Sequence, residues 1–286
     1  MRYEAPETLD AAVALLRGSG RARPLAGGTD LLVQLRAGMI EPELVVDLKK
    51  IPGLRTIAKE KGGYRIGAAV SGAELREHPE LKRMWPGVIE AANLIGSTQI
   101  QGRASLGGNL CNASPAADSV PALIAAGATV TIIGADGQRE LPVEAVATGP
   151  GKTVLTKGEI VASFFLPARP PRSGDAYLRF IPRTEMDIAV VGCGVSLTLD
   201  QGGTCIAARV ALGAVAERAL LVPEAAAALI GSKLDAAALE RLSAAARGAC
   251  RPIDDKRGTK AFRIDVAGVL AQRTATIAAA RAGGQS

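Results

Sequence analysis

The sequence predicts an α+β protein in which two parts of unlike pattern follow each other. Up to about residue 170, short apolar strands alternate with helices and glycine turns, and after residue 176 a β-hairpin precedes alanine-rich helices. Between them, the proline-rich, charged segment 168–175 is interpreted as a linker. With 286 residues, of which 48% are hydrophobic, the chain is long enough for two domains. We place these domains at 1–170 and 176–286.

The first part divides again, into lobes at about 1–55 and 56–170. In the first lobe we expect a helix at 8–18, an extended run at 22–25, a helix from Leu31 that ends at Gly38, and a strand at 44–48. In the second lobe we expect strands at 63–68, 129–134 and 160–166, a helix near 87–96, and an apolar helix around 122–126. Each lobe therefore mixes helix and strand.

The second part begins with two β-rich apolar runs, 188–198 and 205–213. The turn signal Asp-Gln-Gly-Gly at 200–203 separates them and predicts a hairpin. Helical patterns follow at 224–230, 236–249 and 259–280, and the two longer ones pair an apolar face with basic residues. The pattern predicts a small α+β domain in which helices cover one face of a hairpin sheet.

Two glycine pairs, Gly27-Gly28 and Gly107-Gly108, lie about 80 residues apart, each between apolar segments. Glycine reaches positive φ and lets a ligand approach the backbone, so that consecutive N–H groups can surround an anion. Two such turns would suit a diphosphate. Thr29 could add a hydroxyl donor, and Asp30 is expected to cap the following helix with its charge turned away. The alternative is an ordinary turn before a capped helix.

Neither glycine pair matches the Rossmann or Walker nucleotide motifs. The stretch 149–153, Gly-Pro-Gly-Lys-Thr, ends like a Walker loop, but Val146 occupies the place of the first glycine. We interpret this stretch as a surface turn.

Composition excludes several other classes of site. The four cysteines lie far apart without a C-x-x-C pair, and they are interpreted as buried small hydrophobes rather than as ligands of iron–sulfur or zinc. The single histidine, His78, stands in a polar turn, where a solvated side chain is expected. The net charge of +6 is dispersed and aromatic residues make up 3%, which argues against nucleic-acid binding. No catalytic or metal-binding residues are predicted.

Four segments then point to a family: 24–32 (PLAGGTDLL), 105–118 (SLGGNLCNASPAAD), 184–189 (TEMDIA) and 252–259 (PIDDKRGT). In this order and spacing, the chain resembles the FAD-binding medium subunit of the xanthine dehydrogenase and carbon monoxide dehydrogenase family of molybdenum hydroxylases. The resemblance runs from Met1 to about Gly268.

The resemblance implies an FAD-binding domain of the p-cresol methylhydroxylase type, built from two lobes, followed by a smaller α+β domain, with noncovalent FAD between them. The residues implied to hold the diphosphate through backbone amides are Leu25, Ala26, Gly27, Gly28, Thr29, Asp30, Ser105, Leu106, Gly107, Gly108 and Asn109. Asp118 would accept from ribose or adenine groups, or else cap the helix that follows. Val161 would adjoin the isoalloxazine ring, and Arg179 stands where relatives often carry a lysine that reaches the flavin.

The resemblance also implies an oxidoreductase subunit that passes electrons from the [2Fe-2S] clusters of a small partner to an external acceptor. A large partner subunit would carry molybdopterin, and the assembly would be a dimer of heterotrimers. No apolar run approaches the length of about 18 residues that a membrane span needs, and no signal peptide is apparent, so a cytoplasmic location is expected. A self-sufficient reductase that uses NAD(P)H and a scaffold whose glycine turns are merely structural are the alternatives.

Overall fold

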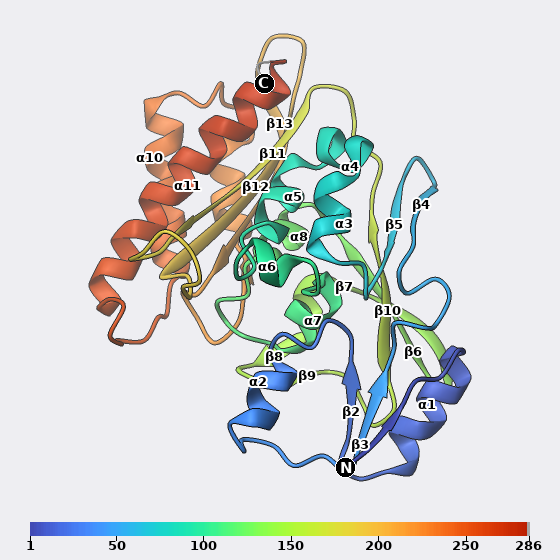
Figure 1. The fold of residues 1–286 in the computed structure, drawn as a ribbon. Helices are drawn as coiled ribbons and strands as arrows, with labels where there is room; N and C mark the ends of the chain where they lie inside the picture. Colours follow the sequence, from blue (N-terminus) through green and yellow to red (C-terminus); the bar gives the residue numbers. More distant parts are fainter. Residues whose placement is uncertain (285–286) are drawn as a thin grey trace.

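In the computed structural model, which describes residues 1–284, the first lobe is a parallel three-stranded sheet with one helix packed on it (Figure 1). The strand order is β1-β3-β2, with β1 at Arg2–Glu4, β2 at Ala22–Leu25 and β3 at Leu44–Asp47. Helix α1 (Leu9–Gly18) begins where the Thr8 hydroxyl accepts the N–H of Ala11, and it buries Ala12, Val13 and Leu16 against β3. Helix α2 (Leu31–Arg36) follows β2. The expected elements are confirmed, whereas β1 was not predicted because its three residues are exposed.

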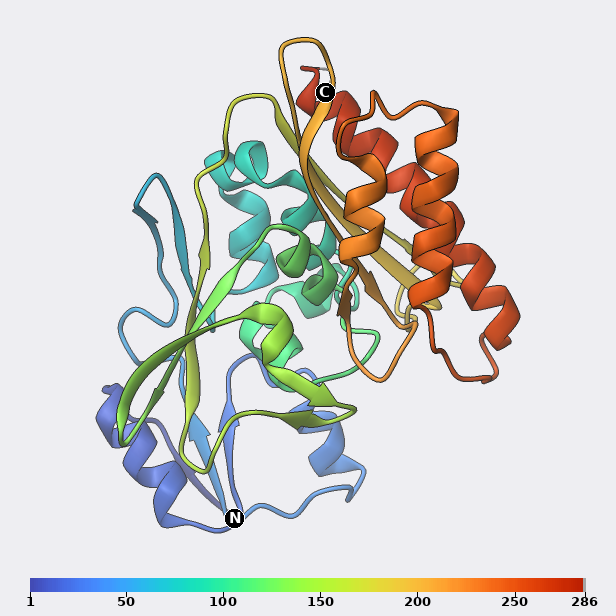
Figure 2. The ribbon, with the colours of Figure 1, turned by 180° about the vertical axis from the view of Figure 1, so that it is seen from behind.

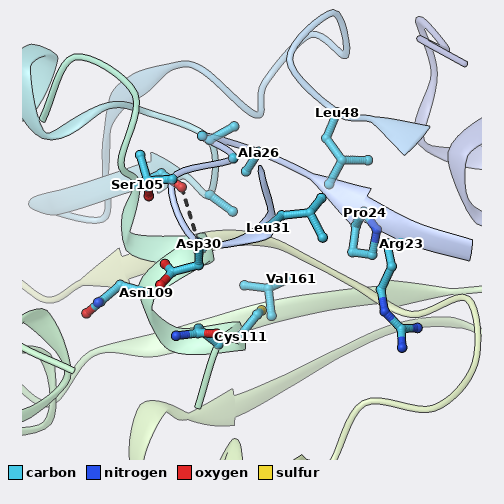
Figure 3. A pocket seen from close by; sticks show the side chains of 18 of the residues that line it. Arg23, Pro24, Ala26, Asp30, Leu31, Leu48, Ser105, Asn109, Cys111 and Val161 are labelled. Carbon is cyan, nitrogen blue, oxygen red and sulfur yellow. Dashed lines mark hydrogen bonds between the residues drawn. The ribbon is translucent and has the colours of Figure 1, made fainter. Parts of the chain in front are cut away.

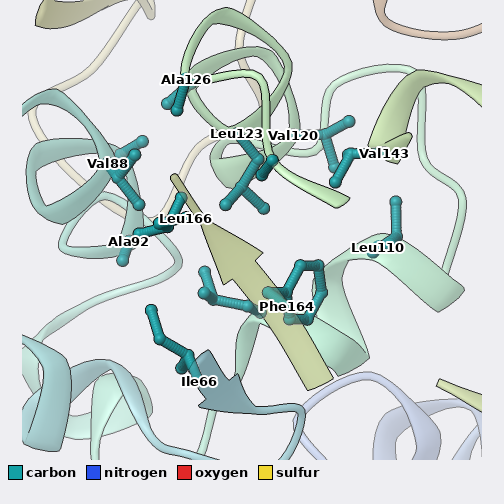
Figure 4. Packing of buried hydrophobic residues seen from close by; sticks show 14 of the residues in the cluster. Ile66, Val88, Ala92, Leu110, Val120, Leu123, Ala126, Val143, Phe164 and Leu166 are labelled. Carbon is teal, nitrogen blue, oxygen red and sulfur yellow. The ribbon is translucent and has the colours of Figure 1, made fainter. Parts of the chain in front are cut away.

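The second lobe is an antiparallel sheet of five strands in the order β4-β5-β10-β6-β7. Their bounds are Ile57–Glu60 (β4), Gly63–Gly67 (β5), Ile160–Leu166 (β10), Thr129–Gly134 (β6) and Gly137–Pro142 (β7). Strand β10 is central, and its fully buried Phe164 packs among side chains of the sheet and of the helices that cover it, including Ile66 and Leu123 (Figure 4).

Short helices connect these strands: α3 (Gly72–Glu77), α4 (Pro79–Met84), α5 (Pro86–Ala92), α6 (Thr98–Gln101), α7 (Leu106–Cys111), α8 (Ser119–Ala125) and the 3-10 turn η1 (Val143–Ala145). A small ribbon, β8 (Ala147–Gly149) with β9 (Lys152–Thr153), turns at Gly151. The turn predicted at 149–153 therefore lies inside a two-stranded ribbon.

The C-terminal part is an antiparallel sheet of β11 (Ser173–Phe180), β12 (Val191–Leu199), β13 (Cys205–Gly213) and β14 (Leu220–Leu221). Helices α9 (Pro223–Leu229), α10 (Ala236–Ala249) and α11 (Lys260–Ala282) cover one face, as Figure 2 shows from behind. Helices α5 and α8 of the second lobe contact the opposite side of this sheet. The expected hairpin and its helices are confirmed.

Two sequence-based interpretations need correction here. Strand β11 begins at Ser173, so the predicted linker at 168–175 is wrong in its last residues, and Asp175 is buried. The His78 side chain is half-buried rather than solvated, because its Nδ1 accepts the N–H of Leu81 at 3.2 Å and its ring meets that of Tyr64 edge-on. It thereby caps helix α4.

The four cysteines are free thiols, and Cys193, Cys205 and Cys250 are buried as predicted, whereas Cys111 is only partly buried. Within residues 1–284, no helix is both long and apolar enough to cross a membrane.

Candidate functional site

A cavity of about 550 Å³ lies where the first lobe meets α7 and β10, and both glycine pairs reach it (Figure 3). Of the residues predicted to bind cofactor, its wall contains Ala26, Gly27, Gly28, Thr29, Asp30, Ser105, Gly107, Gly108, Asn109 and Val161. The fold therefore brings together two segments that are far apart in the sequence. Leu25 and Leu106 do not belong to this wall, because their side chains are buried in the core.

The first glycine loop, residues 26–30, connects β2 to α2. Gly27 is held against the neighbouring chain so closely that a Cβ on it would stand 1.9 Å from the Arg103 carbonyl oxygen. Gly28 has a φ of 81°. Within residues 1–284, the amides of Gly27, Gly28, Thr29 and Asp30 donate no hydrogen bond. Four adjacent N–H donors at a cavity wall form a suitable cradle for an anionic group such as a phosphate.

Lys49 anchors the first glycine loop by a hydrogen bond. Its Nζ donates to the Ala26 carbonyl at 3.0 Å and to Asp47 Oδ1 at 2.7 Å, while the Tyr3 hydroxyl donates to Asp47 Oδ2 at 2.6 Å. Burial works against ionisation of Asp47, but the bonds from Lys49 and Tyr3 outweigh it and lower its pKa. The Ala26 carbonyl is thus occupied by a cation, which reduces its repulsion of an anion in the cavity. No sequence signal identified Lys49.

The second glycine segment, residues 105–109, forms the start of α7 and differs from the expectation. Neither of its glycines has a positive φ. Three of its amides already have partners: Gly107 N–H donates to Ala68 O at 3.1 Å, Gly108 N–H to Ser105 Oγ at 3.2 Å, and Asn109 N–H to Ser105 O at 3.0 Å.

Its two glycines serve different steric purposes. A Cβ on Gly107 would stand 2.5 Å from Ala68 O, so that glycine permits close packing of backbone on backbone. A Cβ on Gly108 would meet only Ser105 Oγ, at 3.3 Å, within 4 Å. Because Gly108 lines the cavity, its missing side chain leaves room for a ligand.

Asp30 departs from its predicted role as a capping side chain. It occupies the N-cap position of α2 in helical conformation and makes no capping hydrogen bond. Its carboxyl lies at the cavity wall, where desolvation raises its pKa (Figure 3).

Asp118 and Arg179 lie outside the cavity wall and contact each other. Arg179 Nη1 donates to Asp118 Oδ2 at 2.9 Å, and the Tyr177 hydroxyl donates to Oδ1 at 3.4 Å. Burial raises the pKa of Asp118 to about 6, against the opposing charge of Arg179. Asp118 makes no capping bond on α8, so that alternative is wrong. Both of its oxygens have protein partners, and its contact with the cofactor stays a prediction.

Glu159, just before β10, is a wall residue that the sequence did not single out. Arg139 donates to its two oxygens from Nε and Nη2, each at 2.8 Å, and the N–H of Thr156 donates at 2.7 Å. The bonds from Arg139 are the main reason why the pKa of Glu159 falls to about 2. The pair fixes the chain just before Ile160 and Val161, which also line the cavity. Arg23, Gln34 and Gly151 are among the other wall residues that were not predicted.

Replacing Glu159 by glutamine is expected to lower stability by about 1–2 kcal/mol at pH 7, because solvent screens the partly exposed Arg139 and limits the strength of the pair. The folded pKa lies below the ordinary 4.5, so the ionised group stabilises above pH 4.5, and this contribution is lost as the pH falls towards 2. Urea unfolding of the wild-type protein and the variant should show that the difference between their free energies of unfolding shrinks as the pH falls from 7 to 2. Glu77→Gln, at an exposed residue without an ion pair in the described chain, is the control. A difference in stability that does not depend on pH would contradict the stabilising role of ionised Glu159.

Comparison with known proteins gives the following relationships. The model for the FAD binding domain in molybdopterin dehydrogenase matches residues 1–169, and that for the CO dehydrogenase flavoprotein C-terminal domain matches residues 176–278. A xanthine dehydrogenase FAD-binding subunit of Escherichia coli O157:H7 is 32% identical over 285 residues, which cover 99% of this chain and 97% of the relative. A carbon monoxide dehydrogenase medium chain of Afipia carboxidovorans is 33% identical over 281 residues, 98% of this chain and 97% of that one.

Comparison with solved structures gives the same relationship. Reconstituted CO dehydrogenase from Oligotropha carboxidovorans contains a chain that superposes with a TM-score of 0.94 at 32% identity, covering 98% of both chains. A chain of quinoline 2-oxidoreductase from Pseudomonas putida 86 gives a TM-score of 0.91 at 29% identity, covering 99% of this chain and 98% of that one.

Proposed function

Because this chain belongs to the FAD-binding subunits of the xanthine dehydrogenase and carbon monoxide dehydrogenase family, we propose that it passes electrons from the [2Fe-2S] clusters of a partner subunit to an external acceptor. The family, the α+β fold, the oxidoreductase class and FAD as the cofactor, all predicted from the sequence, are confirmed. The transfer of electrons between subunits is our proposal.

The observation that carries the proposal is the cavity between the two glycine segments. The four amides of Gly27–Asp30, which donate to no other group within residues 1–284, suit a phosphate, and the open space at Gly108 leaves room for it. Leu25 and Leu106, which were expected to contribute amides, would support these loops from the core. When bound, FAD supplies the electron-accepting chemistry, while the protein binds, orients and shields it.

Partner subunits complete the proposal. Relatives named as medium chains or FAD-binding subunits support an assembly in which other chains hold the metal centres. We propose a small [2Fe-2S] subunit and a large molybdopterin subunit, assembled with this chain as a dimer of heterotrimers in the cytoplasm. We propose domains at 1–170 and 176–286, with the diphosphate of FAD in the cavity where the first lobe meets α7 and β10. Val161 would then adjoin the isoalloxazine ring, with Arg179 nearby.

The direct test uses electrons rather than a substrate. The purified chain should carry about one noncovalent FAD, released by acid. Under anaerobic conditions it is mixed with the separately purified [2Fe-2S] subunit, reduced beforehand with dithionite and freed of excess reductant. The yellow flavin absorption should disappear as the cluster absorption returns, and the oxidised subunit is the control.

Two results would count against the proposal. A flavin that stays oxidised beside the reduced partner would rule out the transfer. Rapid bleaching of the isolated chain by NADPH would instead favour a self-sufficient reductase.

A further inference from the structure

The side chain of Asn109 is fixed by a buried serine on the next helix. Its Oδ1 accepts two hydrogen bonds from Ser119, one from the backbone N–H at 3.2 Å and one from the hydroxyl at 2.7 Å. Ser119 is the first residue of α8 and is fully buried, whereas Asn109 lies in the wall of the cavity. A residue outside the cavity therefore sets the orientation of a side chain inside it.

These two bonds decide which end of the amide faces the cavity. A backbone N–H can only donate, so the end of Asn109 that faces Ser119 has to be the oxygen. The other end is Nδ2, which carries two donors and makes no hydrogen bond within residues 1–284. With the amide reversed, Nδ2 would meet the N–H of Ser119, donor against donor. Ser119 thus orients the Asn109 amide so that the two N–H donors of Nδ2 point away from α8.

This donor pair matters because the backbone of the second glycine segment offers few free N–H donors. The amides of Gly107, Gly108 and Asn109 are occupied within the protein, in contrast to those of Gly27–Asp30 across the cavity. An anion bound between the two segments needs donors from both sides. On the α7 side, the Nδ2 of Asn109 can supply such donors.

The start of α8 is itself held firmly. Asp118, the residue before Ser119, is paired with Arg179 and accepts from Tyr177, both on β11. The C-terminal sheet therefore fixes the position from which Ser119 acts. A loosely held serine could not impose an orientation on the amide.

We propose that Ser119 is a positioning residue for FAD, which holds Asn109 so that its Nδ2 donates to the diphosphate. The inference rests on the binding of FAD by this cavity. In this inference, the second glycine segment binds FAD through the side chain of Asn109, which Ser119 orients, rather than through its backbone amides.

The test is a titration of the apoprotein with FAD, followed by flavin fluorescence. Ser119→Ala removes the hydroxyl bond of 2.7 Å and leaves only the longer bond from the backbone N–H, at 3.2 Å, to hold the amide, so binding should weaken about tenfold. Asn109→Asp keeps the acceptor for Ser119 but replaces the outward donor by an anionic oxygen, so FAD binding should fall about a hundredfold or more while the thermal stability of the apoprotein is retained. Ser243→Ala removes another fully buried hydroxyl, one without a hydrogen-bond partner among residues 1–284, and should leave the affinity unchanged.

A double-mutant cycle separates positioning from a general structural role. If Ser119 acts through Asn109, adding Ser119→Ala to Asn109→Ala should change the affinity for FAD by less than about twofold. The ³¹P resonances of bound FAD should also shift in Ser119→Ala at saturating FAD. Full additivity of the two changes, or wild-type affinity in Ser119→Ala, would overturn the inference. Failure of the wild-type protein to bind FAD would instead refute the proposed function.

Discussion

Replacing Gly108 by valine is expected to weaken FAD binding strongly while the fold survives. A Cβ at this position meets one protein atom, Ser105 Oγ at 3.3 Å, so the valine methyl groups would enter the cavity rather than the core. Valine also forms helix better than glycine does, so α7 should not be weakened. We expect FAD affinity to fall by about a hundredfold or more, equal to about 3 kcal/mol. Titration of the apoprotein with FAD, with thermal unfolding alongside, measures both quantities.

The matched control is Gly248→Val. Gly248 is also helical, in α10, and a Cβ there has no neighbour within 4 Å. Gly137, in a turn of the second lobe, is unsuitable because its φ of 109° would strain any side chain. Equal FAD affinity in the Gly108 and Gly248 variants would show that the ligand does not occupy the space beside α7.

The sequence predicts best where one pattern decides the local structure. Helix α1, strand β6 and helix α10 were placed within a residue of their observed bounds, because apolar periodicity and capping residues are local properties. Strand β1 has only three exposed residues and exists because it pairs with β3, about 40 residues away. Such pairing leaves no local pattern.

The same division holds for the candidate site. Gly27 and Gly28 are recognisable because two adjacent glycines at a turn between apolar segments are themselves a strong local signal. Lys49, Glu159 and Ser119 are ordinary in sequence and acquire their roles from partners in other elements. Even Asp118 and Arg179, both predicted as separate contacts, turn out to pair with each other across 61 residues.

Breaking the ion pair between Arg169 and Asp175 is expected to destabilise the protein by about 3–5 kcal/mol, because it leaves a buried charge without its partner. The two side chains are 9% and 5% exposed, and they meet at 2.7 Å where the second lobe joins β11. The Arg169 guanidinium also lies 4.5 Å from the centre of the Trp85 ring, and Asp175 accepts the N–H of Gly87 at 2.8 Å. Arg169→Met should therefore weaken the contact between α5 and the C-terminal sheet.

This loss should depend on pH in a definite direction. Burial raises the pKa of Asp175 to about 6 even beside Arg169, and removal of the cation should raise it further. A folded pKa above the ordinary 3.8 means that protonation favours the folded state, so stability is lost as the pH rises through the folded pKa. Urea unfolding should find Arg169→Met less destabilised at pH 5 than at pH 8.

Adding Asp175→Asn to Arg169→Met supplies the decisive comparison. The amide can still accept from Gly87 but carries no charge, so the double variant should recover part of the stability at pH 8 and lose the dependence on pH. A double variant that is no more stable than Arg169→Met at pH 8 would mean that the loss comes from the missing packing on Trp85 rather than from an unpaired charge. Arg169 would then contribute to the junction of the second lobe and β11 through its stacking on Trp85, beside the contacts that α5 and α8 make with the C-terminal sheet.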